Sequence, residues 1–219
     1  MHPLILGGGV GALLLVSPPV HAGCPAPQAA VQEAFIPADC AHCWSAPTAL
    51  PGAPGWRLDW ILPAAANAPL AAAALAEAAE RAARAGAEPA VAGRPSALRL
   101  QVASGPAWNG YFGVQMTVQS ARAGSNRAGL PAGSTAWLAL VELLPAGTDG
   151  SPVARALVRS VAGPLPLDRP ASGPPLAQPL SHLRALRWPE GARPERLQAR
   201  AWIEAPTGQV QLMAADRCP

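Results

Sequence analysis

The hydrophobic and polar positions of this chain follow two patterns, and the change between them comes about halfway along the sequence. In the first part, residues 31–36 form a short apolar run that stops at Pro37, and residues 56–62 form a second run that stops at Pro63. Short apolar runs bounded by proline and glycine are typical of buried strands. We therefore predict two strands here, with the motif of residues 40–43 in the connection between them.

Residues 70–85 predict the longest helix of the chain. Nearly all of them are strong helix formers, Asn67 can cap the start, and Gly86 suits the end. Two Glu–Arg pairs lie four residues apart, in the favourable order: Glu77–Arg81 and Glu80–Arg84. The many alanines permit close packing on a sheet, so we interpret this helix as structural.

From residue 97 onward, apolar and polar residues alternate with the period of two that half-buried strands have. The continuous apolar run of residues 137–141 is expected to be a central strand, and the other expected strands cover residues 98–102, 114–118, 157–161, 197–204 and 209–212. A four-residue connection that contains Pro206 and Gly208 predicts a hairpin between the last two. Residues 163–179 are rich in proline, so we expect a crossover or a surface loop there. Several strands without a convincing helix favour an antiparallel β-sandwich.

The first 22 residues have the pattern of a secretion signal. Residues 4–16 are apolar but too few for a membrane span, which needs about 20 apolar residues, and residues 20–22 fit the small-residue cleavage rule. We therefore expect a periplasmic or secreted protein. As an alternative, Ala22-Gly23-Cys24 resembles the end of a bacterial lipobox. Only a lipid on Cys24 would then place the chain at a membrane.

The composition excludes some classes of function. Half of the residues are hydrophobic, so the chain can build a substantial core, while its formal net charge is only +3. The basic residues are all arginine and are scattered along the sequence. Nucleic-acid binding usually needs a basic cluster, so we expect no nucleic-acid partner.

Four cysteines in a secreted chain indicate disulfide bonds, and three pairings are possible. Their spacing favours a bond between Cys40 and Cys43. It leaves Cys24 and Cys218 to form a second bond that ties the two ends of the mature chain together.

The Cys40-Ala41-His42-Cys43 motif carries the only candidate chemistry in the sequence. If Cys40 begins a helix, free N–H groups and the helix dipole stabilise its thiolate. Cys40 would then attack a disulfide and Cys43 would resolve the mixed disulfide. The His42 side chain adds positive character between the two sulfurs and makes the pair more oxidising.

Two other interpretations of the motif stay open. The pair is either an inert disulfide on a secreted binding or envelope protein, or a metal site. A zinc site would need further ligands, so Cu(I) is the only metal worth testing, and we expect no metal and no cofactor. Trp44 stands where a c-type haem attachment site has histidine.

The other polar and aromatic side chains that stand out in the sequence are interpreted as structural. Asp39 and Asp59 are isolated carboxylates, which favours solvent-facing or turn positions over an acid–base pair. Trp108, Tyr111 and Phe112 flank Asn109-Gly110 and could form a binding patch. A core-facing aromatic strand is the favoured interpretation.

Three segments carry a resemblance to known proteins: residues 39–43 after the first strand, residues 88–93 around Pro89, and residues 199–211 before the last cysteine. Together they resemble secreted bacterial thioredoxin-like proteins of uncharacterised function, found mostly in proteobacteria, whose C-terminal half is immunoglobulin-like.

The resemblance implies an α+β fold in which an abbreviated thioredoxin-like domain (residues 23–96) follows the signal peptide (residues 1–22). An immunoglobulin-like antiparallel β-sandwich domain then covers residues 97–219. It also implies a thiol–disulfide oxidoreductase that acts on protein thiols or disulfides through Cys40 and Cys43. In such proteins a cis proline faces the cysteine pair, and Pro89 is the residue expected to take that place.

Overall fold

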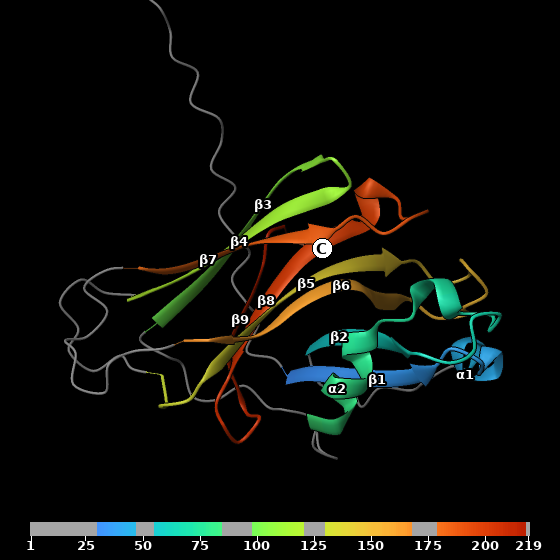
Figure 1. The fold of residues 1–219 in the computed structure, drawn as a ribbon, viewed down its shortest axis with the longest axis horizontal. Coiled ribbons are helices and arrows are strands. Elements are labelled where there is room, and N and C mark those ends of the chain that lie inside the picture. Colours follow the sequence, from blue (N-terminus) through green and yellow to red (C-terminus); the bar gives the residue numbers. More distant parts are fainter. Residues whose placement is uncertain (1–29, 47–54, 85–97, 121–129, 168–178, 218–219) are drawn as a thin grey trace, which may run out of the picture.

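In the part of the chain that the structure describes, the fold is mostly β, with two short α-helices and two sheets (Figure 1). The computed structural model describes residues 30–46, 55–84, 98–120, 130–167 and 179–217. Its strands are β1 (Ala30–Pro37), β2 (Gly55–Leu62), β3 (Leu98–Trp108), β4 (Tyr111–Ser120), β5 (Thr135–Leu144), β6 (Arg155–Pro166), β7 (Leu180–Arg187), β8 (Leu197–Glu204) and β9 (Val210–Ala215). Its helical segments are α1 (Ala41–Ser45), η1 (Ala71–Ala73), α2 (Ala76–Arg84) and η2 (Pro194–Arg196).

A curled six-stranded sheet in the order β1-β2-β6-β5-β8-β9 forms the body of the molecule. Strands β1, β2 and β6 run parallel, and β5, β8 and β9 continue the sheet with antiparallel pairing. A second, antiparallel sheet in the order β3-β4-β7 packs against one face of the large sheet, and α2 packs against the opposite face (Figure 1). Strands from both halves of the chain therefore share the large sheet. The predicted domain boundary at residues 96–97 lies outside the described residues.

Every strand that the alternation predicts is present, and the hairpin between β8 and β9 is confirmed. One prediction about the segments between the strands needs correction, and one strand was missed. Residues 163–166, expected in a loop, are the last residues of β6, and Leu165 and Pro166 pair with β5. Strand β7 was not predicted, because its apolar residues do not all fall on one face: Leu180 and Leu186 lie on one side of the strand, and Leu183 and Ala185 on the other.

The predicted helix over residues 70–85 is wrong in its first half. The chain forms the short η1 turn, becomes extended at Ala74, and begins α2 only at Ala76. Ala74 bridges to Ile61, and the Leu75 N–H donates to the carbonyl of Ile61, so bonding to the end of β2 outweighs helix propensity here. Asn67 lies in the preceding turn and does not cap a helix. No helix among the described residues is long and apolar enough to cross a bilayer.

One group of buried charges and indoles joins α2 to the large sheet. The guanidinium of Arg81 donates to the carboxylates of Glu33 on β1 and Glu204 on β8. The indole N–H groups of three tryptophans complete the bonding of these carboxylates: Trp60, Trp137 and Trp202. Burial lowers the pKa of Arg81, but the bonds to the two carboxylates outweigh this and raise the pKa above its ordinary value. The buried guanidinium thus has two carboxylates of opposite charge beside it in the core.

The ring of Trp137 leaves no room for a side chain at residue 163. A Cβ atom added to Gly163 would lie 2.4 Å from Cε3 and 2.7 Å from Cδ2 of the indole. Trp137 is buried, and its N–H donates to Glu204, so the ring cannot move without breaking that bond. Glycine at residue 163 is thus required by the close approach of β6 to the indole.

We predict that Gly163→Ala lowers the free energy of unfolding by about 1–3 kcal/mol, the usual effect of overpacking a core. Gly105→Ala is the control, because the added Cβ atom would lie 3.8 Å from the nearest atom outside the adjacent residues, the carbonyl oxygen of Gly113. Urea unfolding of both variants provides the measurement. Equal losses for the two would contradict the steric explanation.

Candidate functional site

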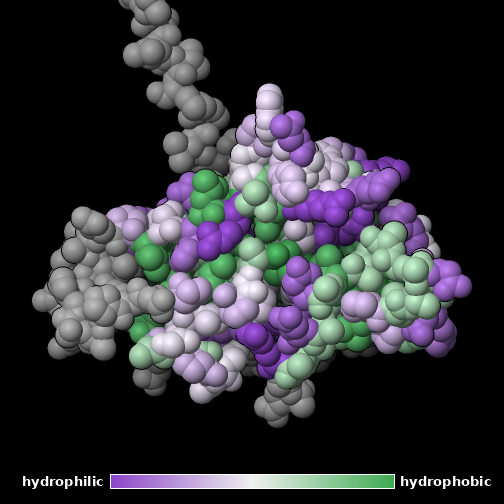
Figure 2. All heavy atoms as spheres, viewed as in Figure 1, coloured by the Kyte–Doolittle hydropathy of each residue, from purple (hydrophilic) through white to green (hydrophobic). Residues whose placement is uncertain are grey.

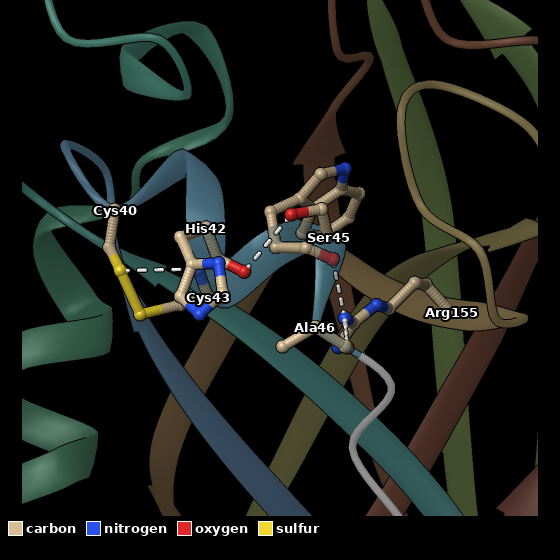
Figure 3. The surroundings of a disulfide bond; sticks show 7 residues. Cys40, His42, Cys43, Ser45, Ala46 and Arg155 are labelled. Carbon is tan, nitrogen blue, oxygen red and sulfur yellow. Dashed lines mark hydrogen bonds between the residues drawn. A yellow bond between two sulfur atoms is a disulfide. The ribbon is translucent and has the colours of Figure 1, made fainter.

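The cysteine pair occupies the turn that follows β1. The Cys40 N–H donates to the carbonyl of Pro37, and α1 begins at the next residue. The two sulfurs form a disulfide of 1.97 Å, with the Cα atoms 5.2 Å apart, which confirms the predicted pairing of Cys40 with Cys43 (Figure 3). Both cysteines are half-buried, and His42 between them is exposed. A reactant arriving from solvent can therefore approach this turn.

The backbone of α1 interacts directly with one of the two sulfurs. Cys40 is the N-cap residue of the helix, and its Sγ accepts a hydrogen bond of 3.2 Å from the Cys43 N–H. Such a donor stabilises negative charge on sulfur. Because α1 has only five residues, this N–H group contributes more than the helix dipole. The arrangement favours Cys40 as the sulfur that carries charge when the bond is open.

The C-terminal end of α1 is held by Arg155, the first residue of β6. The Arg155 side chain donates to the carbonyl oxygens of Trp44 at 2.6 Å and Ala46 at 3.0 Å (Figure 3). Its guanidinium also lies over the Trp44 ring, 5.0 Å from the ring centroid. The Trp44 indole in turn donates to the carbonyl of Asp149, in the connection between β5 and β6. Contacts with residues of the second half of the chain thus fix the position of the cysteine turn.

Asp59 on β2 neutralises the charge of Arg155. Neither side chain is accessible to solvent, and Arg155 Nη1 lies 3.2 Å from Asp59 Oδ1. The same oxygen also accepts from Arg57 at 2.7 Å, while Oδ2 accepts from the Ala156 N–H at 3.0 Å. Asp59 and Leu157 are the one register pair between β2 and β6, so the bond from the Ala156 N–H to the Asp59 carboxylate adds to a sparse backbone pairing. The expectation that Asp59 faces solvent is wrong, because the parallel pairing buries this position.

An open cleft of about 250 Å³ lies beside the cysteine turn. Its lining includes Trp44, Leu70, Leu144 and Leu157, and the same apolar cluster packs against Cys43. The charged part of the lining consists of the Glu142–Arg159 ion pair, with 3.5 Å between Oε2 and Nε, together with Asp149 and Glu190. Figure 2 shows a pale green patch over the alanine-rich segment that contains η1. The cleft is large enough for one apolar side chain of a bound molecule.

The structure brings Cys40, His42 and Cys43 together, as their adjacency in sequence requires, and Asp39 is exposed in a turn as predicted. Pro89, Cys24 and Cys218 lie outside the described residues, so the cis proline and the second disulfide stay predictions. Within the described ranges, no three potential ligand side chains gather at one point that could hold a metal ion. Sequence reasoning missed Arg155, because an arginine at the start of a strand normally faces solvent.

The pair of Asp59 and Arg155 leads to a stability prediction. Asp59→Asn should lower the free energy of unfolding by about 3 kcal/mol or more, because it leaves the buried Arg155 charge without a counterion. Asp149→Asn is the matched control. Its carboxylate is 64% exposed and lies 3.8 Å from Arg196 Nη1, so its loss should cost less than about 1 kcal/mol. Chemical denaturation of the two variants decides between them, and similar effects would contradict the assigned role of Asp59.

In comparisons with known proteins, no protein family, no curated protein and no solved structure matches this chain.

Proposed function

We propose that this protein is a thiol–disulfide oxidoreductase of the periplasm or the extracellular space, with Cys40 as the exchanging cysteine and Cys43 as the resolving cysteine. The observation that carries the proposal is the 3.2 Å hydrogen bond from the Cys43 N–H to Cys40 Sγ, in a turn that solvent can reach. This bond distinguishes the two sulfurs and stabilises the thiolate form of Cys40.

The surrounding fold supports a thioredoxin-like interpretation of the first half. Strand β1, the cysteine turn with α1, and the parallel strand β2 follow one another, which is the order expected for a redox motif placed at the end of a strand. For the second half we propose the immunoglobulin-like relationship that the sequence resemblance implies. Its support is the antiparallel pairing of β5 with β8 and of β3 with β4.

The proposed exchange proceeds in two balanced steps. In the reducing direction, the Cys40 thiolate attacks one sulfur of a substrate disulfide, a mixed disulfide forms, and one substrate thiolate leaves and takes up a proton. The Cys43 thiolate then attacks Cys40 Sγ, re-forms the bond seen here, and releases the second substrate thiol. The protein loses two electrons and the substrate gains two. The reverse sequence oxidises a substrate dithiol.

Arg155 contributes by keeping the turn in place during this cycle. Its bonds to the carbonyls of Trp44 and Ala46 and to Asp59 do not involve either sulfur. Opening of the disulfide therefore leaves the anchor of α1 intact, so the Cys43 N–H stays near Cys40 Sγ. The apolar cleft lined by Trp44 and Leu70 lies close enough to take a side chain of the substrate polypeptide.

We predict that the Cys40–Cys43 pair has a reduction potential above about −300 mV, the level below which structural disulfides resist reduction. His42→Ala should make the potential more negative by roughly 10–30 mV, since about 30 mV corresponds to a tenfold change in the equilibrium constant. Ser45→Ala, at an exposed position of the same helix, serves as the control and should change little. The measurement is titration of the purified protein in glutathione buffers. A wild-type potential well below −300 mV would mark an inert structural bond and refute the proposed function.

The unequal roles of the two sulfurs give a second prediction. Cys43→Ser should accumulate a mixed disulfide between Cys40 and glutathione when it is incubated with oxidised glutathione, because no resolving thiol remains. Cys40→Ser should form the corresponding adduct at least tenfold more slowly, since it lacks the sulfur that the backbone N–H stabilises. Mass spectrometry of the intact proteins over time provides the rates. Faster adduct formation by Cys40→Ser would reverse the assignment.

A further inference from the structure

The small sheet carries exposed aromatic side chains that the redox chemistry does not use. Among the described residues, the large hydrophobic side chains that are exposed are Trp108 (78%), Tyr111 (49%) and Leu183 (65%). Tyr111 pairs with Trp108 on one side, and Leu183 pairs with Gln115 two rows further along the same face. Cross-strand partners lie on the same face of a sheet, and so do residues two apart along a strand. All three therefore lie on the face of the small sheet that points away from the core.

The opposite face of the same strands is buried. Val114, Met116 and Val118 are inaccessible to solvent, and Phe112 packs against the same core and stacks on Trp188 with 4.9 Å between the ring centroids. The sequence expectation of a core-facing aromatic strand thus holds for Phe112 alone. Trp108 and Tyr111 are on the solvent side, next to the Asn109-Gly110 turn, in which both residues have positive φ.

The remaining positions of this outer face are polar or small. Amide and hydroxyl side chains occur in three neighbouring rows, those of Gln115, Thr117 and Gln119, with hydrogen bonds from Gln115 to Ser181 at 2.8 Å and from Gln119 to Gln101 at 3.3 Å. Gly113 and Ala185 form the row that separates these rows from the aromatic row, which contains Trp108 and Tyr111. Because both side chains are small or absent, the surface there is shallow. The face runs over residues 111–119 of β4, about 27 Å at the usual rise per strand residue. It is an elongated, nearly flat surface.

The charge of this outer face has one sign. Arg187 pairs with Tyr111 at one end, and Arg99 pairs with Gln119 at the other, and both arginines are exposed. The positions of β3, β4 and β7 that share this face include no aspartate or glutamate. A ligand with scattered negative charge is therefore complementary to it.

From these observations we infer that the outer face of the β3-β4-β7 sheet binds an acidic polysaccharide. Indole and phenol rings offer flat apolar faces together with a polar edge, which suits the C–H faces and hydroxyl groups of sugar rings. The glutamine and hydroxyl side chains supply both donors and acceptors, and the arginines suit the carboxylates of uronic acids. The length of the face allows several sugar rings in a line.

Other partners fit this surface less well. A bilayer interface needs a continuous apolar surface, whereas here the aromatic row is separated from Leu183 by Gly113 and Ala185. A nucleic acid needs many cations along its backbone, and two arginines neutralise only two phosphates. Neither alternative explains the amide and hydroxyl rows.

The test uses the mature chain and polygalacturonate as the acidic polysaccharide, with dextran as a neutral one. We expect retarded migration in native gels that contain polygalacturonate and none in gels that contain dextran. Trp108→Ala combined with Tyr111→Ala should weaken binding at least tenfold, and Arg187→Gln at least threefold. Arg84→Gln, at an exposed position of α2, should leave binding unchanged. Because the substituted side chains are exposed, thermal unfolding should not change, which separates lost binding from lost folding.

The inference fails if the wild type does not bind polygalacturonate, or if the aromatic double variant binds it as well as the wild type does. It also fails if vesicles of phosphatidylglycerol bind the protein more tightly than polygalacturonate and the same variants abolish that binding, since the face would then recognise a lipid surface. The variant with Cys40→Ser and Cys43→Ser should retain polysaccharide binding. Its result separates this inference from the fate of the redox proposal.

Discussion

The buried ion pair between Asp59 and Arg155 is the interaction on which the arrangement of the candidate site depends. Arg155 reaches from β6 to the end of the cysteine helix, and Asp59 on β2 keeps its charge neutralised. Taking two charges out of water costs several kcal/mol per ion unless good geometry and further hydrogen bonds offset it. Here the carboxylate accepts bonds from two guanidinium groups and a backbone N–H, and the Arg155 side chain also donates to Ser151. The pair therefore contributes more to positional specificity than to net stability.

The same principle recurs where α2 meets the sheet. Arg81 is held by two carboxylates and lies over the rings of Trp137 and Trp202, with 4.9 Å and 5.7 Å between Cζ and the ring centroids. Arg200 lies over Trp56 in the same way, and burial lowers its pKa to about 10. A guanidinium can stack on a ring and donate in several directions at once, which an ammonium group cannot. A chain whose basic residues are all arginine is thus suited to a core of this kind.

The sequence predicted the local elements well and their assembly poorly. Alternation along β3, β4 and β8 and the apolar runs of β1 and β2 are local signals, and the adjacency of Cys40 and Cys43 made their bond evident. Asp59 and Arg155 are 96 positions apart in the sequence. No local sequence pattern distinguishes a buried arginine from an exposed one. The split of the helix at Ala74 has a similar cause, because it depends on a bridge to β2. Long-range hydrogen bonding overrode local propensity in both cases.

The junction between β2 and β6 also bears on how the chain could be divided. A fragment that ended near residue 96 would keep the cysteine turn but lose Arg155, the whole of β6 and the connection that holds the Trp44 indole. Strand β2 would then present an open edge, and Asp59, whose carboxylate is buried in the intact protein, would be exposed on it. Unprotected strand edges promote association between chains. In this architecture the cysteine pair belongs to one half of the sequence and the side chains that hold its turn belong to the other, so the smallest unit that could support the site extends from β1 through at least β6.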